Sequence, residues 1–198
     1  MTIVLGVRHA TVENPQNVVY ARLPGFGLSS EGRAAAERTG DALASAPVRA
    51  VYASPLERAR ETAAALAAAH GLEVIVDERL IEWSFWSRWE GFEWERVRDD
   101  DPETFRIYAE DPGSLHPEDP LQAAGERVVS WAEEAAFEHG DGVVIGVSHE
   151  APLAAAYLAG RGESMRGFPA VHIPHLQGVR LLPPPPELTD PRAVVQKP

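Results

Sequence analysis

Residues 3–9 read IVLGVRH and residues 143–149 read VVIGVSH, so a short apolar run followed by a histidine occurs twice. Unbroken apolar runs of this length are typical of parallel strands that are buried on both faces of a sheet. Ligands in open α/β sheets bind beyond the carboxyl ends of the strands. A single histidine after a strand is usually a solvated loop residue, but the repeat favours a shared site. The two runs therefore predict a parallel sheet whose edge brings His9 and His149 together.

Helical and extended segments alternate outward from these two runs. Helices are predicted where alanine-rich or amphipathic stretches carry a capping residue or end in glycine, over residues 28–46, 55–71, 121–140 and 151–160. Further strands are predicted over residues 48–54, 72–77 and 175–182, the last of them ending the sheet. This alternation predicts the fold class α/β, as a three-layer α/β/α sandwich with a mostly parallel central sheet.

The sequence predicts one domain over residues 1–182, followed by a tail. Residues 83–119 inside this domain are rich in tryptophan and acidic residues and are interrupted by DDDP and EDPGSLHPEDP. We expect this part to be an aromatic and acidic lid insertion with one or two short helices. Residues 183–198 begin with four prolines. Because proline has no backbone N–H, the segment is predicted to be an extended, proline-rich C-terminal tail.

The composition excludes several classes of protein. The 198 residues contain no cysteine, which rules out disulfides and thiolate metal sites. The formal net charge of −12 argues against nucleic acid as a partner, because phosphate backbones attract basic surfaces. The chain has no long apolar run and no basic stretch before its first one, so we expect no membrane span, no signal peptide and a cytoplasmic location. A site for an anion must be built locally from arginines that point inward.

Two arginines are placed to build such a site. Arg8 directly precedes His9, and Arg58 lies near the start of a predicted helix that follows a strand. An arginine on a helix is usually exposed, as we expect for Arg60. The N-terminal end of a helix at the sheet edge, however, favours a bound anion. Two guanidinium groups at that edge predict bidentate binding of a phosphate.

A glutamate stands next to the aromatic cluster of the insertion. Glu82 ends a short apolar run and is followed by Trp83, Phe85, Trp86 and Trp89. A carboxyl group against aromatic surface tends to keep its proton, which suits a general acid. The competing candidates are nearby glutamates that we expect to be solvated, namely Glu90, Glu93 and Glu95. Glu82 is therefore the candidate proton donor.

Four ordered blocks of the sequence resemble the histidine phosphatase superfamily, also called the phosphoglycerate mutase-like family, in its compact phosphatase branch. The blocks are RHA at 8–10, SPLERARETA at 54–63, RLIEWSFWSRWEG at 79–91 and VSHE at 147–150. Their order and approximate spacing agree with that family. The resemblance implies a phosphoglycerate mutase-like fold and a catalytic set of His9 as the phosphorylated nucleophile, Glu82 as the proton donor and His149 beside the phosphoryl group.

The chain departs from the family pattern beside both histidines. Ala10 and Glu150 stand where the family usually has glycine. Alanine takes little room. Glu150 puts a negative charge beside the expected phosphate pocket, where it either narrows the choice of substrate or turns outward. Thr11 and Val12 displace the hydroxyl that usually follows the first block.

The loop after the first block offers further candidates for substrate binding. The family asparagine is matched loosely by Asn14 or Asn17, and Arg22 is a candidate extra phosphate contact. With the arginines that the resemblance implies, the candidate substrate-binding residues are Arg8, Arg58, Arg22 and Asn14.

Together with these residues, the resemblance implies a metal-independent phosphomonoester hydrolase that acts through a phosphohistidine on a small phosphorylated metabolite. Neutral His9 attacks phosphorus, the arginines lower its pKa and spread the transferring charge, and Glu82 serves first as acid and then as base. No metal or cofactor is predicted, because the histidines lack carboxylate or thiolate companions at ligand spacing. Two alternatives stay open: a phosphoglycerate-type mutase, which the compact chain disfavours, and a phospholigand-binding protein without turnover.

The sequence identifies one class of partner, the small phosphorylated substrate. Nucleic acid and membranes are not expected, and a homodimer is compatible with the resemblance because many relatives dimerise through sheet edges or helices. His172 and His175 flank Pro174 and are candidates for lining the pocket, but we expect surface positions for both.

Overall fold

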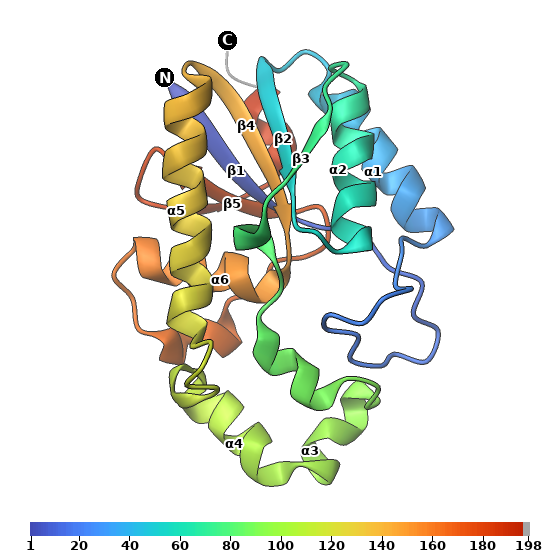
Figure 1. Ribbon diagram of the computed structural model, residues 1–198, viewed down its shortest axis with the longest axis vertical. Coiled ribbons are helices and arrows are strands. Elements are labelled where there is room, and N and C mark those ends of the chain that lie inside the picture. The colour runs from blue at the N-terminus through green and yellow to red at the C-terminus, as the bar shows by residue number, and fades with distance from the viewer. Residues whose placement is uncertain (196–198) are drawn as a thin grey trace.

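The computed structural model describes residues 1–195, and in this part of the chain a six-stranded sheet lies between two layers of helices (Figure 1). The strands are β1 (Thr2–Arg8), β2 (Val48–Ala53), β3 (Val74–Val76), β4 (Gly142–Ser148), β5 (Gly178–Leu182) and β6 (Glu187–Thr189). They lie in the order β3-β2-β4-β1-β5-β6. β1 to β4 are parallel, β5 runs antiparallel to β1, and β6 antiparallel to β5. The predicted α/β sandwich with a mostly parallel sheet is confirmed.

Alternate side chains of the central strands divide the core into two halves. The main helices are α1 (Ser30–Leu43), α2 (Glu57–Ala68), α5 (Leu121–His139) and α6 (Glu150–Gly160). Val4 and Val144 belong to the buried cluster that contains the apolar faces of α5 and α6. Leu5 and Ile145 belong to the cluster formed with α1 and α2. Each strand therefore contributes to both faces, as side chains that alternate along a strand require.

The chain between β3 and α5 leaves the sheet and forms short helices. It contains α3 (Val97–Asp100), α4 (Pro102–Glu110) and 3₁₀ turns at Glu78–Leu80, Ser84–Trp89, Trp94–Arg96 and Pro112–Ser114. Figure 1 shows α3 and α4 beyond the carboxyl ends of the central strands. Trp83, Phe85 and Trp89 are buried in the α5–α6 half of the core. The insertion is therefore anchored by its own aromatic residues.

The C-terminal segment takes part in the sheet. Residues 187–189 form β6 and pair with residues 178–180 of β5, so the expectation that residues 175–182 hold the last strand is wrong. The physical reason is that backbone N–H groups become available again once the proline run ends at Pro186. A 3₁₀ helix follows at Pro191–Val195, and Val195 packs against the α1–α2 half of the core. The last residues of the predicted tail, 196–198, lie outside the described residues.

Helix α5 lies directly against α6 because Gly125 has no side chain. A Cβ atom on Gly125 would lie 2.5 Å from the carbonyl carbon of Ala155 and 2.8 Å from the amide nitrogen of Ala156. Real Cβ atoms do not approach backbone this closely, so any larger residue must push the helices apart.

We expect Gly125→Ala to lower the free energy of unfolding by about 1–3 kcal/mol, because overpacking against backbone outweighs the helix-propensity gain of up to about 1 kcal/mol. Urea denaturation of both proteins measures the difference. Gly167→Ala is the control, since its Cβ would make an ordinary 3.4 Å contact with a Leu158 methyl group. Equal stability of Gly125→Ala and wild type would contradict the proposed constraint on helix spacing.

Candidate active site

The carboxyl ends of neighbouring parallel strands bring the two strand-end histidines together. The register of β1 and β4 pairs Arg8 with Ser148, so His9 and His149 follow at equivalent positions. The His9 amide donates to the Ser148 carbonyl at 3.0 Å. The two imidazole rings are 5.2 Å apart between centroids, and both are buried. The juxtaposition expected from the repeated sequence pattern is present.

His9 has one nitrogen fixed and the other facing a cation. Its Nδ1 lies 2.8 Å from the Ala10 carbonyl oxygen, which requires Nδ1 to carry the proton and donate it. Nε2 then has a free lone pair and accepts from Nε of Arg58 at 3.2 Å. Burial, and next the charge of Arg58, hold the pKa of His9 well below its usual value. His9 is therefore neutral at pH 7, with Nε2 as the nucleophilic atom.

Arg58 is a buried cation held on several sides. Its side chain is 1% exposed. Nη2 donates to the Ala21 carbonyl at 2.6 Å, and the guanidinium lies over the ring of Tyr20, 4.7 Å from its centroid. Thr62, one helical turn later on α2, donates to the Arg58 carbonyl and accepts from the Ala10 amide at 3.0 Å. Thr62 thus joins the end of β1 to α2 and fixes the distance between Arg58 and His9.

His149 is held by the end of β2. Its Nε2 lies 2.8 Å from the Ser54 hydroxyl. Burial, followed by the charge of Arg58, keeps the pKa of His149 well below its usual value. Nδ1 of His149 and Nε of Arg8 are buried polar atoms with no hydrogen-bond partner among the described residues. Buried polar groups normally find partners, so these two atoms are suited to the oxygens of a bound anion.

Glu82 is a buried carboxyl group close to this cluster. It is 9% exposed, and its Oε1 accepts from the Trp83 amide at 2.8 Å. Burial raises the pKa of Glu82 to about 7, against the opposing charge of Arg58. A carboxyl group with this pKa carries a proton in a large fraction of molecules at neutral pH, which suits an acid that later acts as a base.

Arg8 is paired with Glu150, the residue that replaces the family glycine. Nη1 of Arg8 lies 2.7 Å from Glu150 Oε2 and donates to the Ile173 carbonyl at 2.7 Å. The other carboxylate oxygen, Oε1, lies 2.6 Å from Nδ1 of His172 and accepts from the Ile173 amide at 3.2 Å. Of the two orientations left open by the sequence, Glu150 takes the inward one and competes with any anion for Arg8.

A cavity of about 620 Å³ lies over His9 and Glu82. Its wall combines polar and apolar groups. Besides Arg8, the lining includes Asn14, Asn17, Tyr20, Trp86, Trp94, Tyr108, Glu150, Phe168, His172 and His175. Asn14 lines the cavity, but its side chain bonds both backbone groups of Val18, with Nδ2 donating at 2.9 Å and Oδ1 accepting at 3.1 Å. These two bonds hold the Asn14 side chain against its own loop, and its role in substrate binding stays a prediction.

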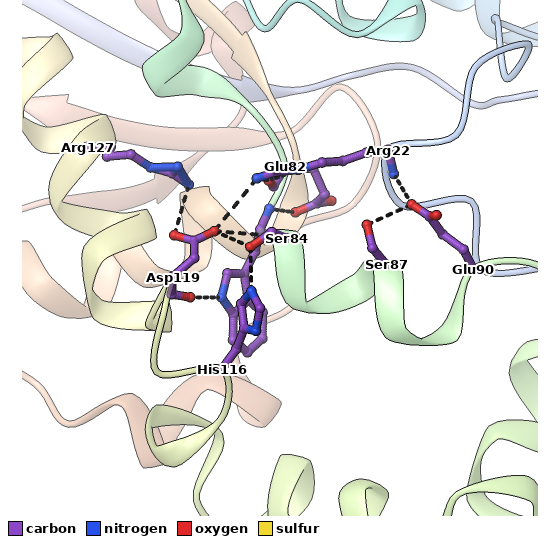
Figure 2. Close-up of polar contacts among 9 residues, drawn as sticks. Arg22, Glu82, Ser84, Ser87, Glu90, His116, Asp119 and Arg127 are labelled. Carbon is purple, nitrogen blue, oxygen red and sulfur yellow. Dashed lines mark hydrogen bonds and ion pairs between the residues drawn. The ribbon is translucent and has the colours of Figure 1, made fainter.

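The Arg22 side chain binds the backbone carbonyl of Glu82. Its Nε donates to the Glu82 carbonyl at 2.9 Å, and Nη2 donates to the same oxygen. Figure 2 shows this guanidinium directed to the backbone of Glu82 and to Asp119. The structure therefore does not bring Arg22 to His9 as a further phosphate contact.

His175 is part of the site although the sequence predicts it at the surface. Its ring lies 5.2 Å from that of His9 between centroids, and Nδ1 lies 2.8 Å from the His9 carbonyl. Both His175 and His172 line the cavity. The expectation of surface positions is wrong for His175 because β5 is antiparallel, so the residues before it lie at the same edge as the carboxyl ends of β1 and β4. A sequence pattern that predicts a mostly parallel sheet does not reveal that β5 runs in the opposite direction, and so it does not place His175 in the site.

Within residues 1–195, no group of three or more histidine and acidic side chains is arranged to hold a metal ion. Across the same range, the structure has no helix with the length and apolar character needed to span a bilayer.

The sequence matches the model of the histidine phosphatase superfamily (branch 1) over residues 4–185, so the chain belongs to this family. Phosphoserine phosphatase 1 of Hydrogenobacter thermophilus is 34% identical over 165 residues, which are 82% of this chain and 77% of that protein. The Mycobacterium tuberculosis protein Rv0525 is 55% identical over 76 residues. That alignment spans only 38% of the length of either chain.

Solved structures share the fold at lower sequence identity. Bacillus stearothermophilus YhfR superposes with a TM-score of 0.80 at 20% identity, covering 97% of both chains. Mycobacterial glucosyl-3-phosphoglycerate phosphatase Rv2419c, in complex with VO3, gives a TM-score of 0.78 at 23% identity, covering 89% of this chain and 90% of that one. At these identities the likeness establishes the phosphoglycerate mutase-like fold.

Glu82→Gln should be more stable than wild type above pH 7. The folded-state pKa of about 7 exceeds the usual value of 4.5, so ionising Glu82 costs wild-type stability as pH rises between these values. We expect the stability difference to grow over that window by up to about 3 kcal/mol and then level off. Urea denaturation of both proteins from pH 4 to 9 measures it. A difference that is flat with pH would show that Glu82 has an ordinary pKa.

Glu150→Gln should bind inorganic phosphate about 3- to 10-fold more tightly, because Arg8 loses a competing carboxylate in a partly solvated site. Calorimetric titration with phosphate measures the change without requiring turnover. Glu163→Gln is the control, since Glu163 accepts from Nε of Arg161 and Glu163 is an exposed residue outside the cavity lining. If Glu150→Gln bound phosphate with unchanged affinity, Arg8 would not be a phosphate-binding residue for which Glu150 competes.

Proposed function

We propose that this protein is a metal-independent phosphomonoesterase in which His9 is transiently phosphorylated. The observation that carries the proposal is the geometry of His9, with Nδ1 held by the Ala10 carbonyl and the Nε2 lone pair facing Arg58. A neutral imidazole in this tautomer is a nucleophile, and a guanidinium beside it stabilises the charge of a transferring phosphoryl group. When a phosphate enters, its oxygens take over the N–H groups of Arg58 and leave the lone pair free.

The first step transfers the phosphoryl group to His9. Nε2 attacks phosphorus, the ester P–O bond breaks, and the proton of the Glu82 carboxyl group goes to the leaving oxygen. Arg8, Arg58 and His149 bind the phosphoryl oxygens in this proposal. The buried polar atoms of Arg8 and His149 that lack hydrogen-bond partners within residues 1–195 support their part in it.

The second step hydrolyses the phosphohistidine. Glu82, now ionised, takes a proton from water as the water oxygen bonds to phosphorus, and the N–P bond breaks to regenerate neutral His9. A pKa of about 7 allows Glu82 to alternate between the two forms near neutral pH. Positively charged arginines supply the electrostatic stabilisation that a metal ion would otherwise give.

The substrate class that we propose is a small phosphorylated metabolite. A cavity of about 620 Å³ has the size of a metabolite site, and its wall carries both hydrogen-bonding and aromatic groups. Phosphoserine is the first compound to test, because the H. thermophilus relative at 34% identity is a phosphoserine phosphatase. Glucosyl-3-phosphoglycerate is the second, from the mycobacterial enzyme that shares the fold.

His9→Ala should lose at least about 10³-fold in phosphatase activity, since the covalent intermediate can no longer form. Phosphate release from a panel of phosphorylated metabolites, with and without EDTA, measures turnover for wild type and variant. Wild-type activity that survives EDTA supports the metal-free mechanism. Full activity in His9→Ala would overturn the assignment of the nucleophile, and phosphate binding without release from any compound would point to a binding protein.

A further inference from the structure

One peptide group connects the proposed acid to the half-buried side chain of Arg22. The N–H of the peptide between Glu82 and Trp83 donates to Glu82 Oε1 at 2.8 Å. The C=O of the same peptide accepts from Nε and Nη2 of Arg22 (Figure 2). Because a cation on the carbonyl polarises the whole amide, its N–H becomes a stronger donor. Arg22 therefore acts on the carboxyl of Glu82 through one rigid, planar group.

Asp119 holds Arg22 and the residues that follow Glu82. Its Oδ2 lies 3.7 Å from Nη2 of Arg22 and accepts from the Ser84 amide at 3.2 Å and from the Ser84 hydroxyl. The Asp119 carbonyl accepts from the Trp83 indole at 2.7 Å. Burial acts to raise the pKa of Asp119, but hydrogen bonds from Ser84 and the neighbouring arginine charges outweigh it and keep the pKa below its usual value. Asp119 is thus an anion at neutral pH.

A second arginine supports Asp119 from α5. Nη2 of Arg127 lies 4.0 Å from Asp119 Oδ1, on the opposite oxygen from Arg22 (Figure 2). Nε and Nη2 of Arg127 are buried and make no hydrogen bond to the described residues. Asp119 therefore lies between two cations, whose charges favour its ionised form.

The backbone of Arg22 is fixed as well as its side chain. The Arg22 amide donates to Glu90 Oε1 at 3.0 Å, and the same oxygen accepts from the Ser87 hydroxyl at 2.8 Å. The preceding residue, Ala21, has a φ of 33° and binds Arg58 through its carbonyl. Adjacent residues of one loop thus contact the two proposed catalytic partners of His9, namely Arg58 and Glu82.

We propose that Arg22, held by Asp119, is a positioning residue that fixes the carboxyl group of Glu82 through the peptide between Glu82 and Trp83. The inference rests on the proposed function, in which Glu82 protonates the leaving group. In this proposal Arg22 positions Glu82, whereas the sequence suggests that Arg22 contacts the phosphate.

Leaving-group dependence tests the proposal, because only a poor leaving group needs a proton. The measurement is the single-turnover release of phenol from phenyl phosphate and of dinitrophenolate from 2,4-dinitrophenyl phosphate. Arg22→Met should slow the first about 10- to 100-fold and the second less than about 3-fold. Arg22→Lys, which keeps a cation but has one donor nitrogen in place of a fork, should recover part of the loss. Asp119→Asn should show the same selectivity in weaker form.

Arg88→Met is the matched control for these variants. Arg88 donates to Asp101 at 2.7 Å, and Asp101 also accepts from a tryptophan indole, so this ion pair resembles that of Arg22 but does not reach Glu82. We expect it to release both products at the wild-type rate. Thermal unfolding confirms that each variant is folded, and calorimetric binding of inorganic phosphate should be unchanged in Arg22→Met.

The outcomes separate this inference from the proposed function. Equal slowing on both esters, or phosphate binding weakened about 10-fold or more in Arg22→Met, would overturn the positioning role. If Glu82→Gln slows phenyl phosphate selectively and Arg22→Met does not, the inference alone fails. If Glu82→Gln shows no selectivity, or wild type releases neither product, the proposed function fails and the inference with it.

Discussion

The contact between Nε of Arg58 and Nε2 of His9 is the interaction on which the rest of the site depends. It places a permanent charge in the protein interior, where the charge of Glu82 acts on it but no carboxylate among residues 1–195 forms a salt bridge with it. Burying an unpaired charge is costly. The Ala21 carbonyl, the Tyr20 ring and the imidazole offset part of that cost, and an arriving phosphate supplies the missing countercharge. Burial, and next the charge of Arg58, lower the pKa of His9, so the cation that attracts an anion also helps to keep the nucleophile neutral.

The sheet and the His9–His149 edge could be predicted because buried parallel strands have a strong local signal. The position of His175 could not, since strand direction is a property of the whole sheet and β5 runs against β1. The direction of the Arg22 side chain could not be predicted either. Its direction depends on Ala21, which adopts a left-handed φ of 33° without being glycine, and no local pattern reveals such a turn. The sequence likewise could not decide whether Glu150 faces inward, because its partners come from distant segments.

The charge pattern of the pocket follows from the composition. A chain with a net charge of −12 needs a local excess of cations to attract a phosphate, and Arg8 and Arg58 provide it. Glu150 offsets one of them and also binds His172. As a result, the charge of Arg58 is available to an anion, whereas the charge of Arg8 is shared with Glu150. This arrangement suits a phosphomonoester better than a ligand carrying several phosphates, whose added charge Glu150 would repel.

The close approach of α5 and α6 at Gly125 has a consequence beyond stability. Helix α5 carries Arg127 only two residues further on, and α6 begins at Glu150, directly after His149. The gap between these helices therefore sets where the support of Asp119 lies relative to the end of β4. A substitution that changes this gap therefore alters core packing and, at the same time, the alignment of Glu82 with His9. A larger residue at Gly125 is therefore expected to affect stability and the geometry of the site together.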